Sequence, residues 1–353
     1  MTLSAFSHPY LCGLVGDDET AEYFSAEAEI AAMLGFERAL AHAQAAADLV
    51  PAAAAARIGT ACGSFVPDMD ALRAGAARDG VVVPELVRQL KASVGADVAT
   101  HVHMGATSQD VIDTSLMVRL QQVCALFIDR LDALDHLFRD LDERFGDRAL
   151  MGHTRMQAAI LITVADRIRA WREPLQRHRH RLKQYAAEGF PIQFGGAAGT
   201  LDKLGHNGPS IRSAMASELG LSDAPQWQSQ RDRLAEFGSL ISLISGSLGK
   251  LGQDVALLAE LGGEIALAGG GGSSAMAHKQ NPVAAEVLVS LARYNAVQLS
   301  GLHQSLVHEQ ERSGAAWTLE WLILPQMVVA TGAALRLAGE LIGNIRMLGR
   351  DQS

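Results

Sequence analysis

The chain has 353 residues and a net charge of −9 without a long basic run, so nucleic acid is not an expected partner. It is too long for one simple core and indicates two or three domains. Hydrophobic residues make up 48% of the chain and aromatic residues only 5%, and the many small aliphatic side chains favour closely packed helices, so we expect an all-α fold.

The three cysteines and the N-terminus give no sign of secretion. Cys12, Cys62 and Cys124 are far apart and form no CxxC pair, so neither a disulfide framework nor a zinc site is expected. The first twenty residues do not combine a basic start with an apolar run of signal-peptide length. No segment approaches 18 uncharged apolar residues, which predicts no membrane span. These features together predict a cytoplasmic protein.

The first hundred residues have the pattern of short helices. A helix is predicted over 28–50 and ends at Pro51, and Pro67, Pro84 and several glycines interrupt the stretch between this helix and residue 100. No run of alternating β-branched residues stands out, so strands should be rare.

A much longer helix is predicted over 108–145, which contains neither proline nor glycine. Its apolar residues recur in steps of three and four, the spacing of one helical face: Leu116, Leu120, Val123, Phe127, Leu131, Leu134, Phe138, Leu141 and Phe145. A helix of nearly forty residues is about 60 Å long at its usual rise per residue, so it must pack against other long helices.

Four further long helices are predicted to provide that packing. They cover 156–187 with a kink at Pro174, 229–261, 284–308, and 318–345 with an interruption near Pro325. Long antiparallel helices joined by glycine-rich connections form an extended bundle. Some apolar stripes would stay uncovered in one bundle, which indicates a partner subunit.

Two glycine-rich loops, 195–200 and 269–274, interrupt the helices, and neither follows a strand, so dinucleotide binding is a weak interpretation. Residues 272–282 read GSSAMAHKQNP. This run resembles the signature loop of the fumarase/aspartase superfamily, G-S-S-x-M-P-x-K-x-N-P, with Ala277 in place of the usual proline.

Enzymes of this superfamily make or break a bond β to a carboxylate through an aci-carboxylate. Such an intermediate needs a proton carrier at the α-carbon and fixed donor groups at the carboxylate. The resemblance implies that Ser273 carries the proton, that Lys279 and Asn281 stabilise the intermediate, and that Ser274 binds substrate. By itself, Ser273 could equally be a helix N-cap.

A second block, residues 101–114, reads HVHMGATSQDVIDT and opens the 108–145 helix. It is similar to the H-x-G-x-T-S-x-D-x-x-D-T stretch of adenylosuccinate lyases and carboxymuconate cycloisomerases. A helix N-terminus with hydroxyl groups can bind an anion. We assign Thr107 and Ser108 to a substrate carboxylate, with His103 nearby, although Ser108 could cap the helix as well.

A third block, residues 152–158, reads GHTRMQA where lyases of the superfamily usually show R-T-H-x-Q. The cycloisomerases share this exchange of His153 and Arg155. A carboxylate leaving group has a solution pKa near 4 and needs no general acid, so an arginine that pairs with it is more useful than a proton donor. The resemblance assigns Arg155 and Gln157 to the substrate, and His153 is left between a structural and a catalytic role.

Two later blocks complete the resemblance. Residues 230–236 match the Q-R-D-R-x-A-E run, in which Gln230 is the contact candidate and the charges of Asp232 and Arg233 suggest an internal ion-pair network. Residues 308–321 resemble the H-E-R-x-x-G-x-W-x-x-E-W region of the cycloisomerases. There the resemblance implies that Arg312 is a second carboxylate ligand, and Trp317 and Trp321 are expected to pack.

The resemblance covers about residues 5–345 and is closest to the carboxymuconate cycloisomerases. It implies an N-terminal helical domain over 1–106, a central bundle over 107–346, and a truncated start of the usual C-terminal domain over 347–353. It also implies a homotetramer whose active sites each draw on three subunits, a small polycarboxylate substrate, and no cofactor or metal.

The implied reaction is lactonisation of 3-carboxy-cis,cis-muconate. Three alternatives stay open: a sulfonated muconate, suggested by Gln228 in place of a histidine and by Ala277; adenylosuccinate or argininosuccinate lyase chemistry; and a catalytically silent structural protein, against which the intact Ser273 argues.

Overall fold

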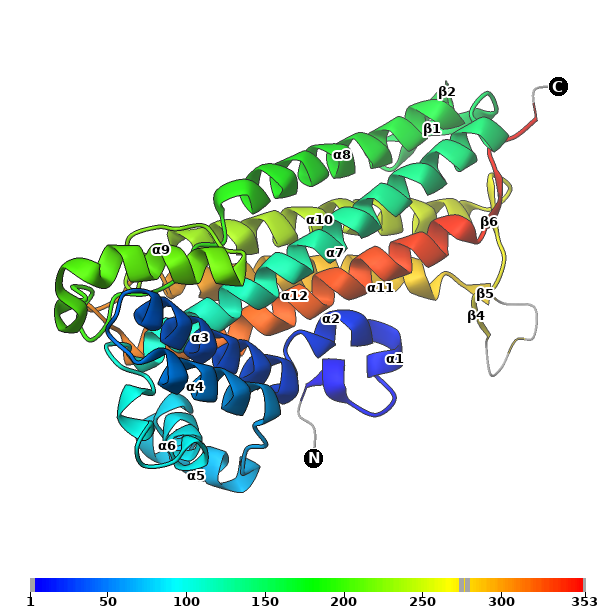
Figure 1. Ribbon diagram of the computed structural model, residues 1–353. Helices are drawn as coiled ribbons and strands as arrows, with labels where there is room; N and C mark the ends of the chain where they lie inside the picture. The colour runs from blue at the N-terminus through cyan, green and yellow to red at the C-terminus, as the bar shows by residue number, and fades with distance from the viewer. Residues whose placement is uncertain (1–3, 273–275, 277–279, 352–353) are drawn as a thin grey trace.

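The computed structural model describes residues 4–272, 276 and 280–351. Five long helices, α7, α8, α10, α11 and α12, run side by side as an extended bundle, and the N-terminal helices α3 to α6 cover one end of it (Figure 1). The expected all-α class is confirmed. The helices are α1 Cys12–Val15, α2 Asp18–Glu22, α3 Ala26–Ala46, α4 Ala52–Ser64, α5 Met69–Asp79, α6 Val83–Val94, α7 Ser108–Phe145, α8 Val164–Glu188, α9 Gly208–Leu219, α10 Asp232–Leu261, α11 Val283–Gln304 and α12 Gly314–Gly343, with three short 3-10 turns, Ala5–Ser7, Ala99–His101 and Asp202–Asn207.

Helix α7 has the predicted bounds because a capping residue marks its start and one apolar stripe runs along its whole length. Thr107 is its N-cap, and the Thr107 N–H donates to the Asp110 carboxylate, which closes the first turn. All nine apolar positions of the predicted stripe are buried, and α7 packs against α8, α3 and α12. The stripe therefore forms the core of the bundle.

The helix predicted over 156–187 is wrong in its first part. Residues Ala149–Thr154 (β1) and Gln157–Thr163 (β2) form an antiparallel hairpin, and α8 begins only at Val164. Two local features explain the difference. Arg155 and Met156 have φ values of 46° and 65°, which turn the chain between the strands. Thr163 and Asp166 form a capping box that starts α8 at the end of β2.

The interruption predicted near Pro325 is also wrong, because α12 continues through this proline. Burial of the neighbouring apolar face, which includes Leu324, Met327 and Val328, holds the helix together there. Pro174 likewise lies inside α8. The other predicted helices differ from the structure by a few residues at their ends, where capping rather than the apolar stripe sets the boundary.

The remaining strands lie at the end of the bundle away from α3 (Figure 1). Ile265–Leu267 (β3) pairs with Ile345–Leu348 (β6), and Gly271–Gly272 (β4) pairs with Gln280–Asn281 (β5), both antiparallel. Strands are thus few and short among the described residues, as predicted. The division at residues 106 and 346 is kept as a proposal about domains.

Two helices, α7 and α12, are long and apolar enough to cross a membrane by length and composition alone. Their most apolar windows are 67% and 72% buried inside the bundle. Their hydropathy is therefore that of core helices, because the apolar side chains pack against neighbouring helices.

Candidate active site

Four segments meet at the N-terminal end of α7. They are the loop 102–107, the glycine-rich loop 195–200, the segment 226–231 and the loop 305–313 that leads into α12 (Figure 1). Hydrogen bonds with Gln109 and Asp110 of α7 hold each of the last three segments in place. Polar side chains from distant parts of the sequence are thereby fixed around one helix N-terminus.

Asp110 anchors the glycine-rich loop to α7. Its buried carboxylate accepts N–H groups from Gly195 at 2.9 Å, from Gly196 at 2.9 Å and from the Gln193 side chain at 3.0 Å. Burial raises the pKa of Asp110 to about 6, although these donors favour the charged carboxylate. Gly196 has a φ of 69° and approaches the Gly105 carbonyl so closely that a side chain would crowd it.

Gln109 positions Arg312. The fully buried Gln109 amide oxygen accepts from Arg312 Nε at 2.9 Å, and its nitrogen donates to the Gln228 carbonyl at 2.7 Å. Arg312 also donates to the Ala197 carbonyl at 3.3 Å. These two acceptors are neutral, and within 4–272, 276 and 280–351 no carboxylate lies within ion-pair distance of Arg312. Its exposed guanidinium thus keeps an unbalanced positive charge at the surface of the site.

A buried ion-pair network lies beneath this surface. Arg231 donates to both Asp113 and Glu320, and its guanidinium stacks on the Trp227 ring at 4.9 Å. Burial opposes the charge of Arg231, but the two carboxylates hold its pKa above the usual value. Burial would raise the pKa of Glu320, but His308 and Arg231 lower it below the ordinary value.

This network differs from the one expected from the sequence. The predicted network centred on Asp232 and Arg233, whereas Arg231 is the buried cation, and Arg233 donates to the Glu188 carbonyl. The two arginines differ because Arg231 lies just before α10 and points into the bundle, whereas Arg233 lies in the first turn of α10.

Three residues of the site, Gln109, Asp113 and Arg231, were not singled out from the sequence, although all three lie inside quoted motifs. Their polar character was visible there, but their burial was not. Trp317 packs as expected and also donates to Asp113 at 3.1 Å.

His103 joins the N-terminal helices to this end of the bundle. Its Nδ1 lies 2.6 Å from the buried Glu37 carboxylate on α3. Burial alone would lower the pKa of His103, but the Glu37 charge and hydrogen bond raise it overall. A φ of 63° at His103 turns the ring toward α3 in a backbone region that few side chains adopt.

The structure thus brings together five of the residues assigned from the sequence: His103, Thr107, Ser108, Gln230 and Arg312. Thr107 and Ser108 are half-buried at the first turn of α7, and Gln230 is exposed just before α10. A helix N-terminus beside a free arginine is a suitable place for a carboxylate.

Three other assigned residues, Arg155, Gln157 and Asn281, lie at the opposite end of the bundle. Arg155 and Gln157 are exposed at the β1–β2 turn, and Asn281 lies in β5 opposite Gly271. Helix α7 alone has 38 residues and separates the two ends by about 57 Å. Ser273, Ser274, Lys279 and His278 lie outside the described residues. One chain therefore does not bring all assigned groups together.

His153 is exposed, and its Nδ1 lies 3.2 Å from the Met151 carbonyl within the same strand. Within the described ranges, no group of three or more His, Cys, Asp or Glu side chains could hold a metal ion.

Comparison with known proteins finds relatives that are lyases and cycloisomerases. A family model described as lyase matches residues 15–295. The 3-carboxy-cis,cis-muconate cycloisomerase of Pseudomonas aeruginosa is 39% identical over 332 residues, which are 92% of this chain and 72% of that protein. The nitrosuccinate lyase of Streptomyces davaonensis is 34% identical over 89% of this chain and 69% of its own.

Among solved structures, the 3-carboxy-cis,cis-muconate lactonizing enzyme of Pseudomonas putida matches with a TM-score of 0.90 and 34% identity. The match covers 96% of this chain and 77% of that one. Both the sequence and the arrangement of helices are therefore similar to those of the lactonizing enzymes.

Proposed function

This chain belongs to the lyase family of the fumarase/aspartase superfamily, and we propose that it is a 3-carboxy-cis,cis-muconate cycloisomerase. Relatives with that name are 34% to 39% identical to it over most of its length. The proposed reaction closes a lactone ring within one substrate molecule and uses no second reactant.

The observation that carries this proposal is the unbalanced charge of Arg312 beside the N-terminus of α7. Gln109 and the Ala197 carbonyl orient the guanidinium, and its described partners leave it free to pair with an anion. Thr107 and Ser108 supply hydroxyl groups in the same first turn, and the Ser108 N–H faces the free end of the helix, whereas the Thr107 N–H is used by Asp110. The Arg312 guanidinium and the first turn of α7 are two neighbouring anion sites, which suit a substrate with several carboxylates. Because the protein as a whole is acidic, such local positive groups are needed to attract this substrate.

In the proposed reaction, an oxygen of one substrate carboxylate forms a bond to an alkene carbon. The electron pair of the alkene moves onto the neighbouring α-carbon and its carboxylate, and this aci-carboxylate then takes a proton. We assign the proton to Ser273 and the stabilisation of the charge to Lys279 and Asn281, with Ser274 as a binding residue. These roles rest on family membership and on the chemistry that the intermediate requires.

We assign Arg155 and Gln157 to the carboxylate that forms the lactone. In the ring-opening direction this carboxylate is the leaving group, and it needs a fixed positive charge rather than a proton. The exposed position of Arg155 at a hairpin turn leaves its guanidinium available to a group outside its own chain.

The site is proposed to be shared between copies of this chain in a homotetramer. Two observations support it: the assigned residues lie at opposite ends of a 38-residue helix, and the hairpin exposes large apolar side chains. Met156, Ile160 and Leu161 are 73%, 71% and 64% exposed, which a partner subunit would cover. A cytoplasmic location is part of the same proposal and is supported by Cys12, Cys62 and Cys124, which form no disulfide.

An ultraviolet assay with the purified protein tests this function. Lactonisation removes one double bond of the conjugated diene, so the absorbance of 3-carboxy-cis,cis-muconate should fall. The control substrates are cis,cis-muconate, which lacks the third carboxylate, 3-sulfomuconate and adenylosuccinate. Turnover of one of the controls without turnover of 3-carboxymuconate would contradict the proposal.

A further inference from the structure

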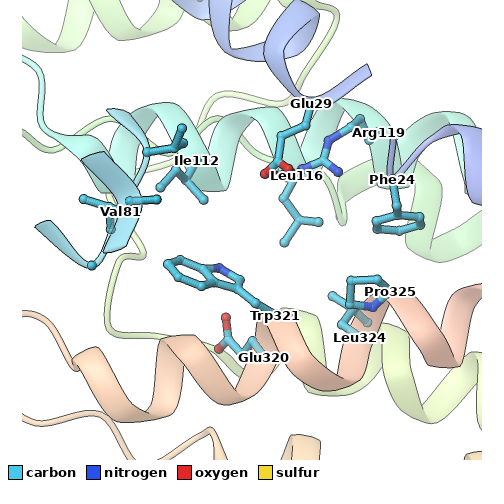
Figure 2. A pocket seen from close by; sticks show the side chains of 13 residues that line it. Phe24, Glu29, Val81, Ile112, Leu116, Arg119, Glu320, Trp321, Leu324 and Pro325 are labelled. Atoms are coloured by element: carbon cyan, nitrogen blue, oxygen red, sulfur yellow. Dashed lines mark hydrogen bonds and ion pairs between the residues drawn. The ribbon is translucent and has the colours of Figure 1, made fainter. Parts of the chain in front are cut away.

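A pocket of about 330 Å³ lies between α7, α12 and the N-terminal helices. Figure 2 shows Ile112 and Leu116 of α7 on one side, and Trp321, Leu324 and Pro325 of α12 on the other. None of its lining residues belongs to the set assigned to the substrate. The walls are mainly apolar, so water in the pocket gains little from staying there.

One charged side chain, Arg119, stands out at this pocket. Its side chain is only 6% exposed, and it donates to the carbonyls of Ser115 and Tyr23, both at 3.2 Å. Its described carboxylate contact is long, 3.5 Å to Glu29. Burial lowers the pKa of Arg119, because the guanidinium is partly desolvated without a close counter-ion.

The two acidic side chains at the pocket, Glu320 and Glu29, leave Arg119 accessible to the carboxylate of a ligand. Glu320 is already paired with Arg231 inside the bundle. The Glu29 side chain is 39% exposed and can turn to solvent when its place beside Arg119 is taken. Figure 2 shows the Arg119 guanidinium next to Glu29, with Phe24 to one side and Leu116 below.

We infer that this pocket binds a small monocarboxylate with an aromatic or branched apolar body. The ligand carboxylate would replace Glu29 on Arg119 and form the two parallel bonds for which a guanidinium is shaped. Its apolar body would lie between Leu116 and Trp321. The proposal concerns binding alone and is independent of the catalytic assignment.

Isothermal calorimetry with phenylacetate tests the inference, and phenylacetamide is the uncharged control of the same shape. We expect saturable binding of phenylacetate and at least tenfold weaker binding of the amide, because a charge-assisted pair is worth roughly 1.5 to 3 kcal/mol. Arg119→Gln should weaken phenylacetate binding by the same factor. Arg139→Gln, an exposed site on the same helix, should leave it unchanged.

A second variant keeps the test decisive if Arg119→Gln does not fold. Val81→Trp fills the pocket from the loop before α6 and leaves Arg119 in place, and it should abolish binding. The inference is overturned if phenylacetate does not bind at millimolar concentration. Equal binding of acid and amide, or binding that Val81→Trp does not reduce, would overturn it as well.

Discussion

Arg312 is the described cation whose charge is left free at the N-terminus of α7. Replacement by glutamine keeps a donor but removes the charge, and a lost charge-assisted contact costs roughly 1.5 to 3 kcal/mol, or about ten- to a hundredfold in rate. We expect Arg312→Gln to lower kcat/KM for 3-carboxymuconate by that factor. Steady-state kinetics would measure kcat/KM, and a melting curve would measure the stability of each variant. Arg73→Gln on α5 is the surface control.

If Arg312→Gln also lowered the melting temperature markedly, the loss of activity could come from a less stable fold. That result would contradict this role for Arg312. The side chain is exposed and its two described acceptors are neutral, so little folding energy depends on it.

Arg155 allows a sharper test, because its place is taken by histidine in most lyases of the superfamily. Histidine offers one charge-assisted bond and is largely neutral above a pKa of about 6.5. We expect Arg155→His to lower kcat/KM by about ten- to a hundredfold, and by more at pH 8 than at pH 6. A pH–rate profile of both proteins checks this. A profile like that of the wild type would show that Arg155 does not hold the substrate.

The chemistry of single residues was predictable where motifs are dense, but burial was not. Arg231 and Arg233 are two positions apart in one charged run, and only the structure shows that the first is enclosed by Asp113 and Glu320. A sequence gives the charge of such a residue, whereas the direction of its side chain depends on where α10 begins. The partners of Arg312 were unpredictable for the same reason.

At the scale of elements, the link between α3 and α7 depends on the charge of His103. Because Glu37 raises the pKa of His103, the pair stabilises the fold fully below about pH 6.5 and loses that contribution as the pH rises through the higher folded-state pKa. Glu37→Gln should therefore cost the most stability near pH 6, and the difference from wild type should narrow toward pH 9.

Urea unfolding of the two proteins across this pH range measures that difference. His103→Asn, which tolerates the same positive φ, is the matched control and should give an equally flattened pH dependence. A constant gap at all pH values would mean that His103 is not charged in the folded protein.

The long helices were predictable because their apolar spacing persists over many turns, and α7 shows this along its whole length. The β1–β2 hairpin was missed because the apolar run Ala158–Ile162 has no alternation and adjoins the helical pattern of α8. Its turn residues, Arg155 and Met156, are not typical of positive φ. The local sequence therefore did not mark the change from strand to helix.

At the scale of the whole molecule, Arg312 lies at one end of the bundle, and Gly271–Gly272, the strand that directly precedes Ser273 in the chain, lies at the other. This arrangement predicts complementation between damaged copies. Ser273→Ala alone should lower turnover at least about a hundredfold, as expected for a positioned acid or base. Arg312→Gln should lower activity because the charge-assisted contact with the substrate is lost. When the two variants are unfolded, mixed in equal amounts and refolded together, mixed oligomers should contain sites in which both residues are intact.

About a quarter of the sites should then be restored, because each residue is intact in half of the copies and the choices are independent. Activity and light scattering of the refolded mixture would be measured beside each variant refolded alone. Recovery no greater than the average of the two variants, or an active monomer, would rule out a site shared between subunits.

The far end of the bundle joins three parts of the chain that are distant in sequence. Ala149 exchanges backbone hydrogen bonds with Arg350, and the Glu264 carboxylate accepts from the Met151 N–H and pairs with Arg350. These connections close loops that span 201 residues (149 to 350), 113 residues (151 to 264) and 86 residues (264 to 350). The entropy of each loop is lost before the bonds that close it form. We therefore expect folding to begin along the buried stripe of α7 and to reach this junction last. Pulsed hydrogen exchange during refolding should protect Val123 and Phe127 before Ala149 and Arg350, and the reverse order would mean that the junction nucleates the fold.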